Sequence, residues 1–306
     1  MKKRPLLICT DPGIDDFIAL CYLLQRPEFE IVGMVALSGN VGLDITVNNT
    51  LLAAEICRRG DIPVVAGARQ PLARAGRDAC NIHGATGLGP VERRAKGAPL
   101  TVDAAAWIAD TARARDGQLE ILSLGPLTDI GRALTLCPDL PVKHLMLMGG
   151  GLCGGNATPQ AEFNILADPE AAAIVFDSAI PRTMMGLDAT SHCIFPKAHL
   201  DQLRASTPLG QMLPAMLTFY TDLYRTVNGI EGCIIHDAIA AIALLHPELF
   251  TMQSCRVAVV TEEGPFLGKT KLEEGAPNTL AVMTSDAAAI ERLLTDGLQA
   301  LYAQGI

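Results

Sequence analysis

The sequence predicts an α/β fold: a single domain, residues 1–306, in which a mostly parallel, doubly wound sheet is flanked by helices. Two observations lead to this prediction. Short apolar runs recur along the chain with amphipathic segments between them, which is the alternation of a βαβ architecture. At 306 residues and 49% apolar content the chain can bury a large core, and α/β chains of this length often form one domain.

The expected strands are short and almost wholly apolar, which is typical of parallel strands buried on both faces. They are Leu6–Cys9, Ile31–Leu37, Pro63–Ala66, Leu119–Leu124, His144–Met148, Pro181–Met185 and Arg256–Val260. The helices expected between them are Asp16–Gln25, Ile45–Arg59, Asp103–Arg115, Leu127–Leu136 and Pro169–Ser178. Right-handed crossovers then give a Rossmann-like sheet. No internal repeat or Pro/Ser-rich linker in the sequence marks a domain boundary.

Composition argues against nucleic-acid polymers and membranes as partners. The net charge is -9 and aromatic residues make up only 4%, whereas binding to a phosphate backbone relies on clustered Lys and Arg and often on stacking aromatics. The apolar run at residues 6–9 is too short for a signal peptide, and no stretch reaches the roughly 18 apolar residues of a membrane helix. Nine cysteines without a C-x-x-C pair favour reduced thiols. We therefore expect a soluble, cytoplasmic protein with a small ligand.

Polar residues and glycines follow several of the expected strands. Ligands of open α/β sheets bind just beyond the carboxyl ends of the strands, and glycines there allow the backbone to approach a ligand closely. The segments concerned are Asp11-Pro12-Gly13-Ile14-Asp15-Asp16, Ser38-Gly39-Asn40, Gly125-Pro126 and Gly149-Gly150-Gly151. The sequence thus predicts a polar site along one edge of the sheet.

Three carboxylates lie within six residues at the first strand end, at Asp11, Asp15 and Asp16, with no Lys or Arg beside them. Such carboxylates repel one another unless a cation lies between them. A hard cation is indicated, and calcium accepts carboxylate, carbonyl and water oxygens more tolerantly than magnesium. The alternative is that Asp15 and Asp16 only cap the following helix. The residues by themselves leave both interpretations open.

Two other site types are disfavoured by spacing. A phosphatase with a strand-end aspartate nucleophile normally has a second Asp two residues later, where this chain has Gly13. No G-x-x-x-x-G-K-[ST] phosphate loop occurs, and the glycines of residues 149–155 lack the G-x-G-x-x-G order of dinucleotide sites.

A series of short motifs, in the same order along essentially the whole chain, resembles the inosine-uridine-preferring nucleoside hydrolase family. Besides the Asp11–Asp16 segment, the motifs are Gly39-Asn40, Asn81-Ile82-His83-Gly84, Thr86-Gly87-Leu88, Gly125-Pro126-Leu127-Thr128, Met148-Gly149-Gly150, Ala161-Glu162-Phe163-Asn164, Ala167-Asp168-Pro169-Glu170-Ala171-Ala172, Gly186-Leu187-Asp188 and His236-Asp237. The resemblance implies an enzyme that hydrolyses the N-glycosidic bond of ribonucleosides to free base and ribose, in nucleoside salvage.

The resemblance also implies roles for individual residues. A calcium ion (Ca2+) would be held by Asp11, Asp16, Asp237 and the backbone carbonyl of Leu124, and Asp11 would be the general base toward a calcium-bound water. His236 would be the general acid toward the leaving base. The ribose hydroxyls would be bound by Asp15, Asn40, Asn156, Glu162 and Asn164, whereas His83, Tyr224 and Asn228 would border the base.

Two alternatives stay open at this stage. One is hydrolysis of another N-ribosyl compound, such as a modified nucleoside or nicotinamide riboside, and the other is a non-catalytic nucleoside-binding protein. Purine or pyrimidine preference is also open, because Ile14, Asp129 and Asn228 depart from residues common in the family. Relatives of this kind are generally dimers or tetramers, so the resemblance implies a homo-oligomer.

Overall fold

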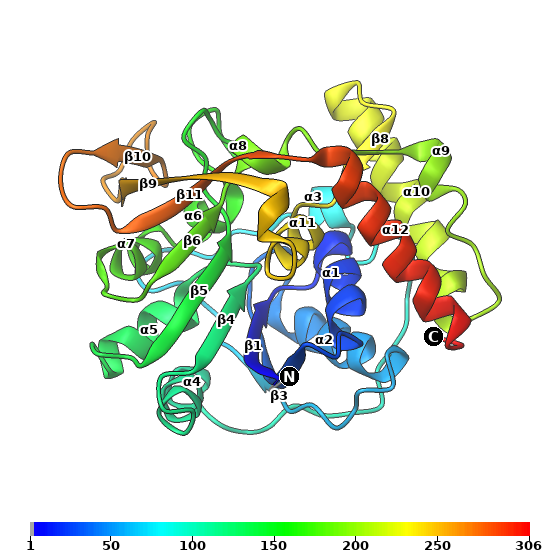
Figure 1. Ribbon diagram of the computed structural model, residues 1–306, viewed down its shortest axis with the longest axis horizontal. Helices are drawn as coiled ribbons and strands as arrows, with labels where there is room; N and C mark the ends of the chain where they lie inside the picture. Colours follow the sequence, from blue (N-terminus) through cyan, green and yellow to red (C-terminus); the bar gives the residue numbers. More distant parts are fainter. Residues whose placement is uncertain (1–2) are drawn as a thin grey trace.

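The computed structural model describes residues 3–306, and its centre is a nine-stranded sheet (Figure 1). The order across the sheet is β10-β9-β11-β6-β5-β4-β1-β2-β3. The strands are β1 Arg4–Thr10, β2 Phe29–Ala36, β3 Val64–Ala66, β4 Leu119–Ser123, β5 Val142–Met148, β6 Arg182–Met185, β9 Phe250–Val259, β10 Thr270–Glu273 and β11 Thr279–Ser285. A separate two-stranded sheet pairs β7 Ile194–Pro196 with β8 Gly232–Ile234.

The sheet is parallel from β3 through β6 and on to β11. The mostly parallel α/β sheet expected from the sequence is therefore confirmed. One expected strand was wrong in direction: residues 256–260 fall largely in β9, which runs antiparallel to both β11 and β10. β9 lies near the edge of the sheet, and its residues are mostly half-buried or exposed. Its short apolar stretch nevertheless has the sequence pattern of a buried parallel strand, which explains the wrong prediction.

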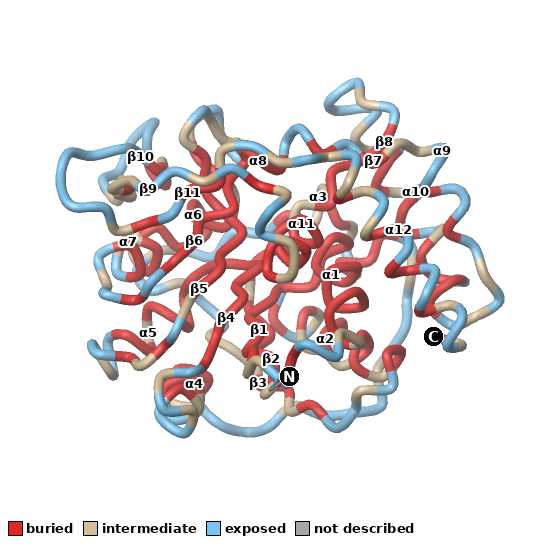
Figure 2. Tube along the Cα trace, in the orientation of Figure 1, coloured by how far each residue is buried: buried red, intermediate tan, exposed pale blue. Residues whose placement is uncertain are grey.

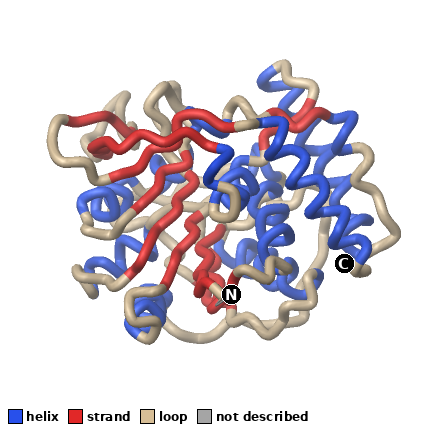
Figure 3. Tube along the Cα trace, in the orientation of Figure 1, coloured by secondary structure: helices blue, strands red, loops and turns tan. Residues whose placement is uncertain are grey.

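Helices cover both faces of the sheet (Figures 1 and 3). One face carries α1 Ile14–Leu24, α2 Leu43–Ile56, α10 Pro208–Asn228, α11 His236–Ala243 and α12 Ala287–Ala303. The other carries α4 Ala104–Arg113, α5 Thr128–Leu136 and α7 Pro169–Asp177. Shorter helices are α3 Cys80–His83, α6 Phe163–Ala167, α8 Leu187–Thr190, α9 Lys197–Leu200 and the 3-10 turn η1 Pro247–Leu249. No helix in residues 3–306 is long and apolar enough to cross a membrane.

Alternating residues of β1 supply both faces of the core. Leu6 and Ile8 pack into the cluster with α1 and α11, whereas Leu7 and Cys9 pack into the cluster with α4 and α5. All four side chains are fully buried, and Figure 2 shows the buried sheet within an exposed outer layer. Burial on both faces explains why the strand reads as an unbroken apolar run.

The strand order places a crevice at the end of β1. From β1 the chain continues to β2 and β3 on one side, and it later returns to β4 on the other side. Ligands of open α/β sheets bind at such a reversal of strand order. The segments after β1 and β4, which begin at Asp11 and Leu124, therefore flank the expected site.

Candidate active site

Four hydrogen bonds, from the end of β1, the turn after it and the loop after β2, fix the Asp16 carboxylate. Oδ1 accepts from Thr10 Oγ1 at 2.6 Å and from the Asp11 backbone N–H at 3.2 Å. Oδ2 accepts from the Gly13 backbone N–H at 3.2 Å and from Asn40 Nδ2 at 3.0 Å. The bond from Gly13 caps the first turn of α1. Asp16 therefore does cap this helix, and the same carboxylate is held at a fixed place at the crevice.

Asp237 comes from the far end of the chain to join Asp15 and Asp16. One carboxylate oxygen of each lies within 4.8 Å of the others, because α11 packs against α1. Each of the three residues is at most 6% exposed. Burial and the neighbouring Asp16 charge raise the pKa of Asp15 to about 8, and the same two causes hold the pKa of Asp237 well above its usual range. The group is therefore costly to ionise without a cation.

The Asp11 carboxylate lies in a narrow slot beside this cluster. Its Oδ2 accepts from the Asn40 backbone N–H at 2.7 Å, and a Cβ built on Gly39 or Gly125 would lie 2.1 Å from one of its oxygens. Within residues 3–306, Oδ1 of Asp11 and Oδ1 of Asp15 are both buried without a hydrogen-bond partner. Two unpartnered buried carboxylate oxygens fit a site for a hard cation, whose preferred ligands are oxygens.

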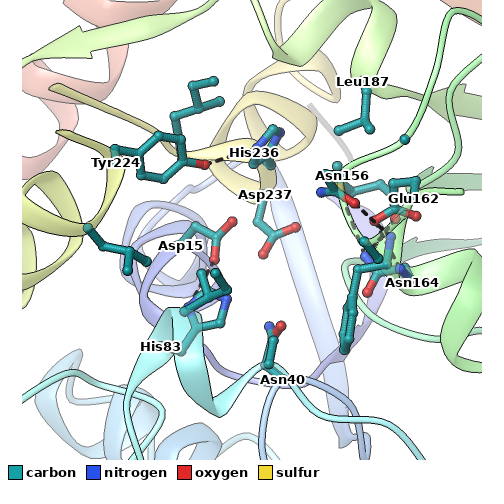
Figure 4. A pocket seen from close by; sticks show the side chains of 18 of the residues that line it. Asp15, Asn40, His83, Asn156, Glu162, Asn164, Leu187, Tyr224, His236 and Asp237 are labelled. Carbon is teal, nitrogen blue, oxygen red and sulfur yellow. Dashed lines mark hydrogen bonds and ion pairs between the residues drawn. The ribbon is translucent and has the colours of Figure 1, made fainter. Parts of the chain in front are cut away.

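Polar side chains after β5 form the opposite wall (Figure 4). Glu162 accepts backbone N–H bonds from Gly150, Asn164 and Ile165 at 2.9 to 3.1 Å, so it caps α6 and holds the glycine-rich turn. Asn164 Nδ2 donates to the Leu124 carbonyl at 2.8 Å, while Asn156 Oδ1 accepts from the Phe163 N–H at 2.9 Å. These bonds orient three predicted ribose ligands and place the Leu124 carbonyl beside them.

Three residues that received no role from the sequence brace this wall and the neighbouring His236. Asp188 accepts the backbone N–H groups of Leu152 and Cys153 at 2.8 and 2.9 Å. Thr270 Oγ1 lies 2.9 Å from both the nitrogen and the oxygen of Gly151. The third is Thr190, which contacts a catalytic candidate described next. Asp188 lies in a recognised motif, but no sequence signal marks the two threonines.

The buried His83, the half-buried His236 and a tyrosine form the far end of the site. His236 Nδ1 lies 2.8 Å from Thr190 Oγ1, and its Nε2 lies 3.3 Å from Tyr224 Oη. His83 Nδ1 accepts the Ile14 backbone N–H at 3.1 Å, so its ring proton is on Nε2. Burial lowers the pKa of His236 to about 4 and that of His83 to about 3. Both rings are therefore neutral near pH 7.

One cavity of about 680 Å³ brings these groups together. The predicted site residues that line it are Asp15, Asn40, His83, Leu124, Asn156, Glu162, Asn164, Tyr224, Asn228, His236 and Asp237. The other two, Asp11 and Asp16, are fully buried and bond to Asn40. A cavity that joins a carboxylate cluster, amides and neutral histidines at a reversal of strand order is typical of an enzyme for a small polar substrate.

Comparison with known proteins identifies the family. The model of the inosine-uridine preferring nucleoside hydrolases matches residues 6–292. The chain is 37% identical to a pyrimidine-specific ribonucleoside hydrolase of Shewanella sp. (strain ANA-3), covering 97% of this chain and 96% of that protein. It is 38% identical to a non-specific ribonucleoside hydrolase of Shigella boydii serotype 18, covering 88% and 87%.

Solved structures agree with the sequence comparison. A plant nucleoside hydrolase superposes with a TM-score of 0.92 at 29% identity, covering 98% of this chain and 100% of that one. A purine-preferring ribonucleoside hydrolase from Gardnerella vaginalis gives a TM-score of 0.92 at 28% identity, covering 97% and 98%. The chain belongs to the inosine-uridine preferring nucleoside hydrolase family and is an enzyme acting on N-glycosidic bonds.

Proposed function

We propose that this enzyme hydrolyses free ribonucleosides to base and ribose with a calcium ion held by Asp11, Asp16, Asp237 and the Leu124 carbonyl. The observation that carries the proposal is the convergence of Asp237 on Asp15 and Asp16 beside two unpartnered buried carboxylate oxygens. The donors are all oxygens, and calcium accepts six to eight oxygens, including carbonyls. When bound, a divalent cation supplies Lewis acidity, lowers the pKa of water and offers positions for sugar hydroxyls.

Asp11 is the general base of the proposed reaction. Its Oδ2 is engaged by the Asn40 backbone, whereas Oδ1 has no hydrogen-bond partner in the described chain. Oδ1 is therefore free to accept a proton from water as the water oxygen attacks C1′ of the ribose. The flanking Gly39 and Gly125 leave the carboxylate little room to turn away.

The ribose is held by Asp15, Asn40, Asn156, Glu162 and Asn164. Asn164 illustrates the orientation: its Nδ2 donates to the carbonyls of Leu124 and Met148 at 2.8 and 3.1 Å. Its Oδ1 is then left to accept from a sugar hydroxyl. The transition state of glycoside hydrolysis carries positive charge on the sugar, so the surrounding carboxylates favour it over the neutral ground state.

The leaving base takes a proton from the pair formed by His236 and Tyr224. Partial burial lowers the pKa of His236 to about 4, so the ring is neutral near pH 7 and does not act as a stored imidazolium. Tyr224 Oη at 3.3 Å from Nε2 is the neighbouring proton carrier. We therefore assign the acid role to the pair and not to His236 alone.

We further infer a single-domain, cytoplasmic homo-oligomer. Both core clusters share β1 through its alternating side chains, which supports one domain. All nine cysteines are unpaired thiols in the structure, which suits a reducing compartment. The oligomer rests on the family resemblance, and sedimentation velocity tests it.

The decisive experiment measures free-base release from inosine, uridine, cytidine, adenosine and nicotinamide riboside, before and after chelation. We expect release from at least one of the first four, loss of activity with chelator and recovery with calcium more than with magnesium. If free base is released only from nicotinamide riboside, the substrate is another N-ribosyl compound and not an ordinary ribonucleoside. Ribose binding without release from any compound would indicate a binding protein, and full activity after chelation would overturn the metal role.

A further inference from the structure

The segment that carries three of the proposed ribose ligands is held from outside by the residues that lead into β10. We call residues 149–166 the ribose wall, because they include Asn156, Glu162 and Asn164, which line the active-site cavity. We call residues 267–270 the clasp. The clasp opens β10 at the edge of the sheet (Figure 1). The two segments are far apart in the sequence, so only the fold brings them together.

The clasp packs directly on the ribose wall. Leu267 is 7% exposed and belongs to a small core cluster, separate from the two large ones, that consists of Ala161, Leu166 and Leu267. The next residue, Gly268, has φ of 76°, and a Cβ there would lie 2.9 Å from Leu166 Cα. Lys269 Nζ donates to Gln160 Oε1 at 2.9 Å. Each of these three clasp residues therefore contacts the wall.

Thr270 completes the clasp and connects it to Glu162 through the glycine-rich turn. Its Oγ1 accepts the Gly151 N–H and donates to the Gly151 carbonyl, both at 2.9 Å, so a single hydroxyl binds both polar groups of this residue. The adjacent Gly150 N–H donates to Glu162 Oε2 at 2.9 Å. Thr270 and Glu162 are only 2% and 3% exposed. Two buried side chains thus hold neighbouring amides of the same turn.

The glycine-rich turn is also enclosed sterically by the sheet and by Thr270. Gly150 has φ of 77°, and a Cβ there would lie 2.9 Å from Met184 Sδ and 3.1 Å from Thr270 Cγ2. Thr270 in turn has a fixed place, because it pairs with Val259 in the register of β10 on β9. The sheet therefore sets the position of the Thr270 hydroxyl, and the hydroxyl sets the position of the turn.

We propose that Thr270 is a positioning residue for ribose binding: its hydroxyl holds the glycine-rich turn, and the turn holds Glu162 toward the sugar. This inference rests on the proposed nucleoside hydrolysis and adds to it a residue that does not touch the substrate, since Thr270 does not line the active-site cavity. Three backbone N–H groups orient the Glu162 carboxylate, and moving a binding group by about 1 Å can cost a large part of the rate. The effect of Thr270 on substrate passes through Gly151 and Glu162.

Thr270→Val tests this role, because it keeps the shape of the side chain and removes the hydroxyl. We expect kcat/KM on the best ribonucleoside to fall about tenfold, as for other losses of a buried hydrogen-bond partner. The comparison is then repeated on the 2′-, 3′- and 5′-deoxy forms of that nucleoside, and forms that are not hydrolysed are measured as competitive inhibitors. The loss should vanish on the form that lacks the hydroxyl bound by Glu162, which is the form on which Glu162→Gln also has the least effect.

Two further variants separate positioning from a general loss of stability. Thr270→Ser keeps the hydroxyl and should bring kcat/KM back to within about twofold of wild type. Thr279→Val is the matched control: Thr279 lies on β11, is 4% exposed, and its Oγ1 donates to Asn278 Oδ1 at 3.0 Å, outside the ribose wall. This variant should leave kcat/KM unchanged on the parent nucleoside and on its deoxy forms, whatever its Tm.

The outcomes distinguish this inference from the proposed function. Equal losses for Thr270→Val on the parent and on every deoxy form would mean that Thr270 only stabilises the fold. That result, or no loss on any of them, would overturn the inference and leave the hydrolysis standing. If the wild-type enzyme hydrolyses no nucleoside, the proposed function fails, and amide hydrogen exchange decides whether Thr270 holds the wall. Faster exchange confined to residues 149–166 in Thr270→Val would support the hold, and unchanged exchange there would reject it.

Discussion

His236 Nδ1 lies 2.8 Å from Thr190 Oγ1, and the same hydroxyl lies 3.3 Å from the Gly186 carbonyl oxygen. A hydroxyl that donates to this carbonyl accepts from Nδ1, so the Nδ1 proton of His236 points at Thr190. The lone pair on Nε2 then faces Tyr224 Oη. Thr190 thereby selects both the tautomer and the orientation of the ring.

Replacing Thr190 by valine should weaken catalysis wherever the base needs a proton. The change keeps the side-chain shape but removes the hydroxyl, and losing a buried partner of this kind costs about 1 to 3 kcal/mol. We expect kcat on a natural nucleoside to fall about tenfold or more, while a riboside with a nitrophenol leaving group changes little. Steady-state kinetics on both substrates provide the measurement.

Two further variants make the Thr190 experiment specific. Thr190→Ser should restore most of the rate because it keeps the hydroxyl. Thr221→Val removes another buried hydroxyl, bonded at 2.8 Å to the Leu217 carbonyl on α10, and should not discriminate between the substrates. Equal losses on both ribosides for Thr190→Val would argue against an acid role for His236.

Asp237→Asn should weaken metal binding strongly without unfolding the protein. The amide keeps the shape of the side chain but removes one of the clustered charges. We expect calcium affinity, measured by isothermal titration calorimetry, to drop at least about 100-fold. Asp286→Asn is the matched control, because Asp286 caps α12 far along the chain and Asn caps a helix about equally well. Unchanged affinity in Asp237→Asn would remove Asp237 from the ligand set.

Without metal, stability should fall as the pH rises. Burial and Asp16 raise the pKa of Asp15 to about 8, above the usual 3.8. Between these values the folded state binds more protons than the unfolded state, so the free energy of unfolding decreases with pH, by at most about 1.4 kcal/mol per pH unit for one group. The contribution of Asp15 to the free energy of unfolding is therefore fully present below about pH 4, and it is lost as the pH rises through about 8.

Calcium should reverse this trend, because a bound cation favours the ionised carboxylates. Thermal unfolding between pH 5 and 9, with chelator and with calcium, measures the effect. The stabilisation by calcium should grow with pH through this window. A difference in Tm that is constant with pH would mean that the cluster is already ionised without metal.

Local sequence patterns were sufficient for much of the fold and for the separate pieces of the site. The apolar run of β1 is unbroken because both faces are covered, and the Asp11–Asp16 segment follows it at a reversal of strand order. The glycine in this segment, by contrast, has a reason that no local pattern reveals, since a Cβ on Gly13 would lie 2.6 Å from Nδ1 of the distant His83.

Contacts between distant segments were beyond sequence reasoning. Nothing in the composition of β9 indicates that it pairs antiparallel with β11, because strand direction depends on the path of the chain. Thr190 and Asp188 act through hydrogen bonds to residues 46 and 36 positions away. Only the resemblance brought Asp237 to the amino-terminal carboxylates, since spacing within the sequence does not report packing of α11 on α1.

Gly125→Ala tests whether the position of the Asp11 carboxylate is essential. A Cβ there would lie 2.1 Å from Asp11 Oδ1 and 3.1 Å from Leu37, so the carboxylate must move. We expect kcat to fall at least about 100-fold, and the free energy of unfolding to fall by about 1 to 3 kcal/mol from overpacking.

The control for this variant is Gly42→Ala. Gly42 precedes α2 with φ of -60°, and a Cβ there meets no atom within 4 Å, so both kcat and stability should stay close to wild type. Calcium affinity of Gly125→Ala separates the two roles of Asp11: if affinity is kept while kcat falls, the carboxylate matters chiefly as the base. If folded Gly125→Ala keeps the wild-type kcat, the position of the Asp11 carboxylate between Gly39 and Gly125 is not essential. In that case Asp11 does not accept the proton of the attacking water from this position.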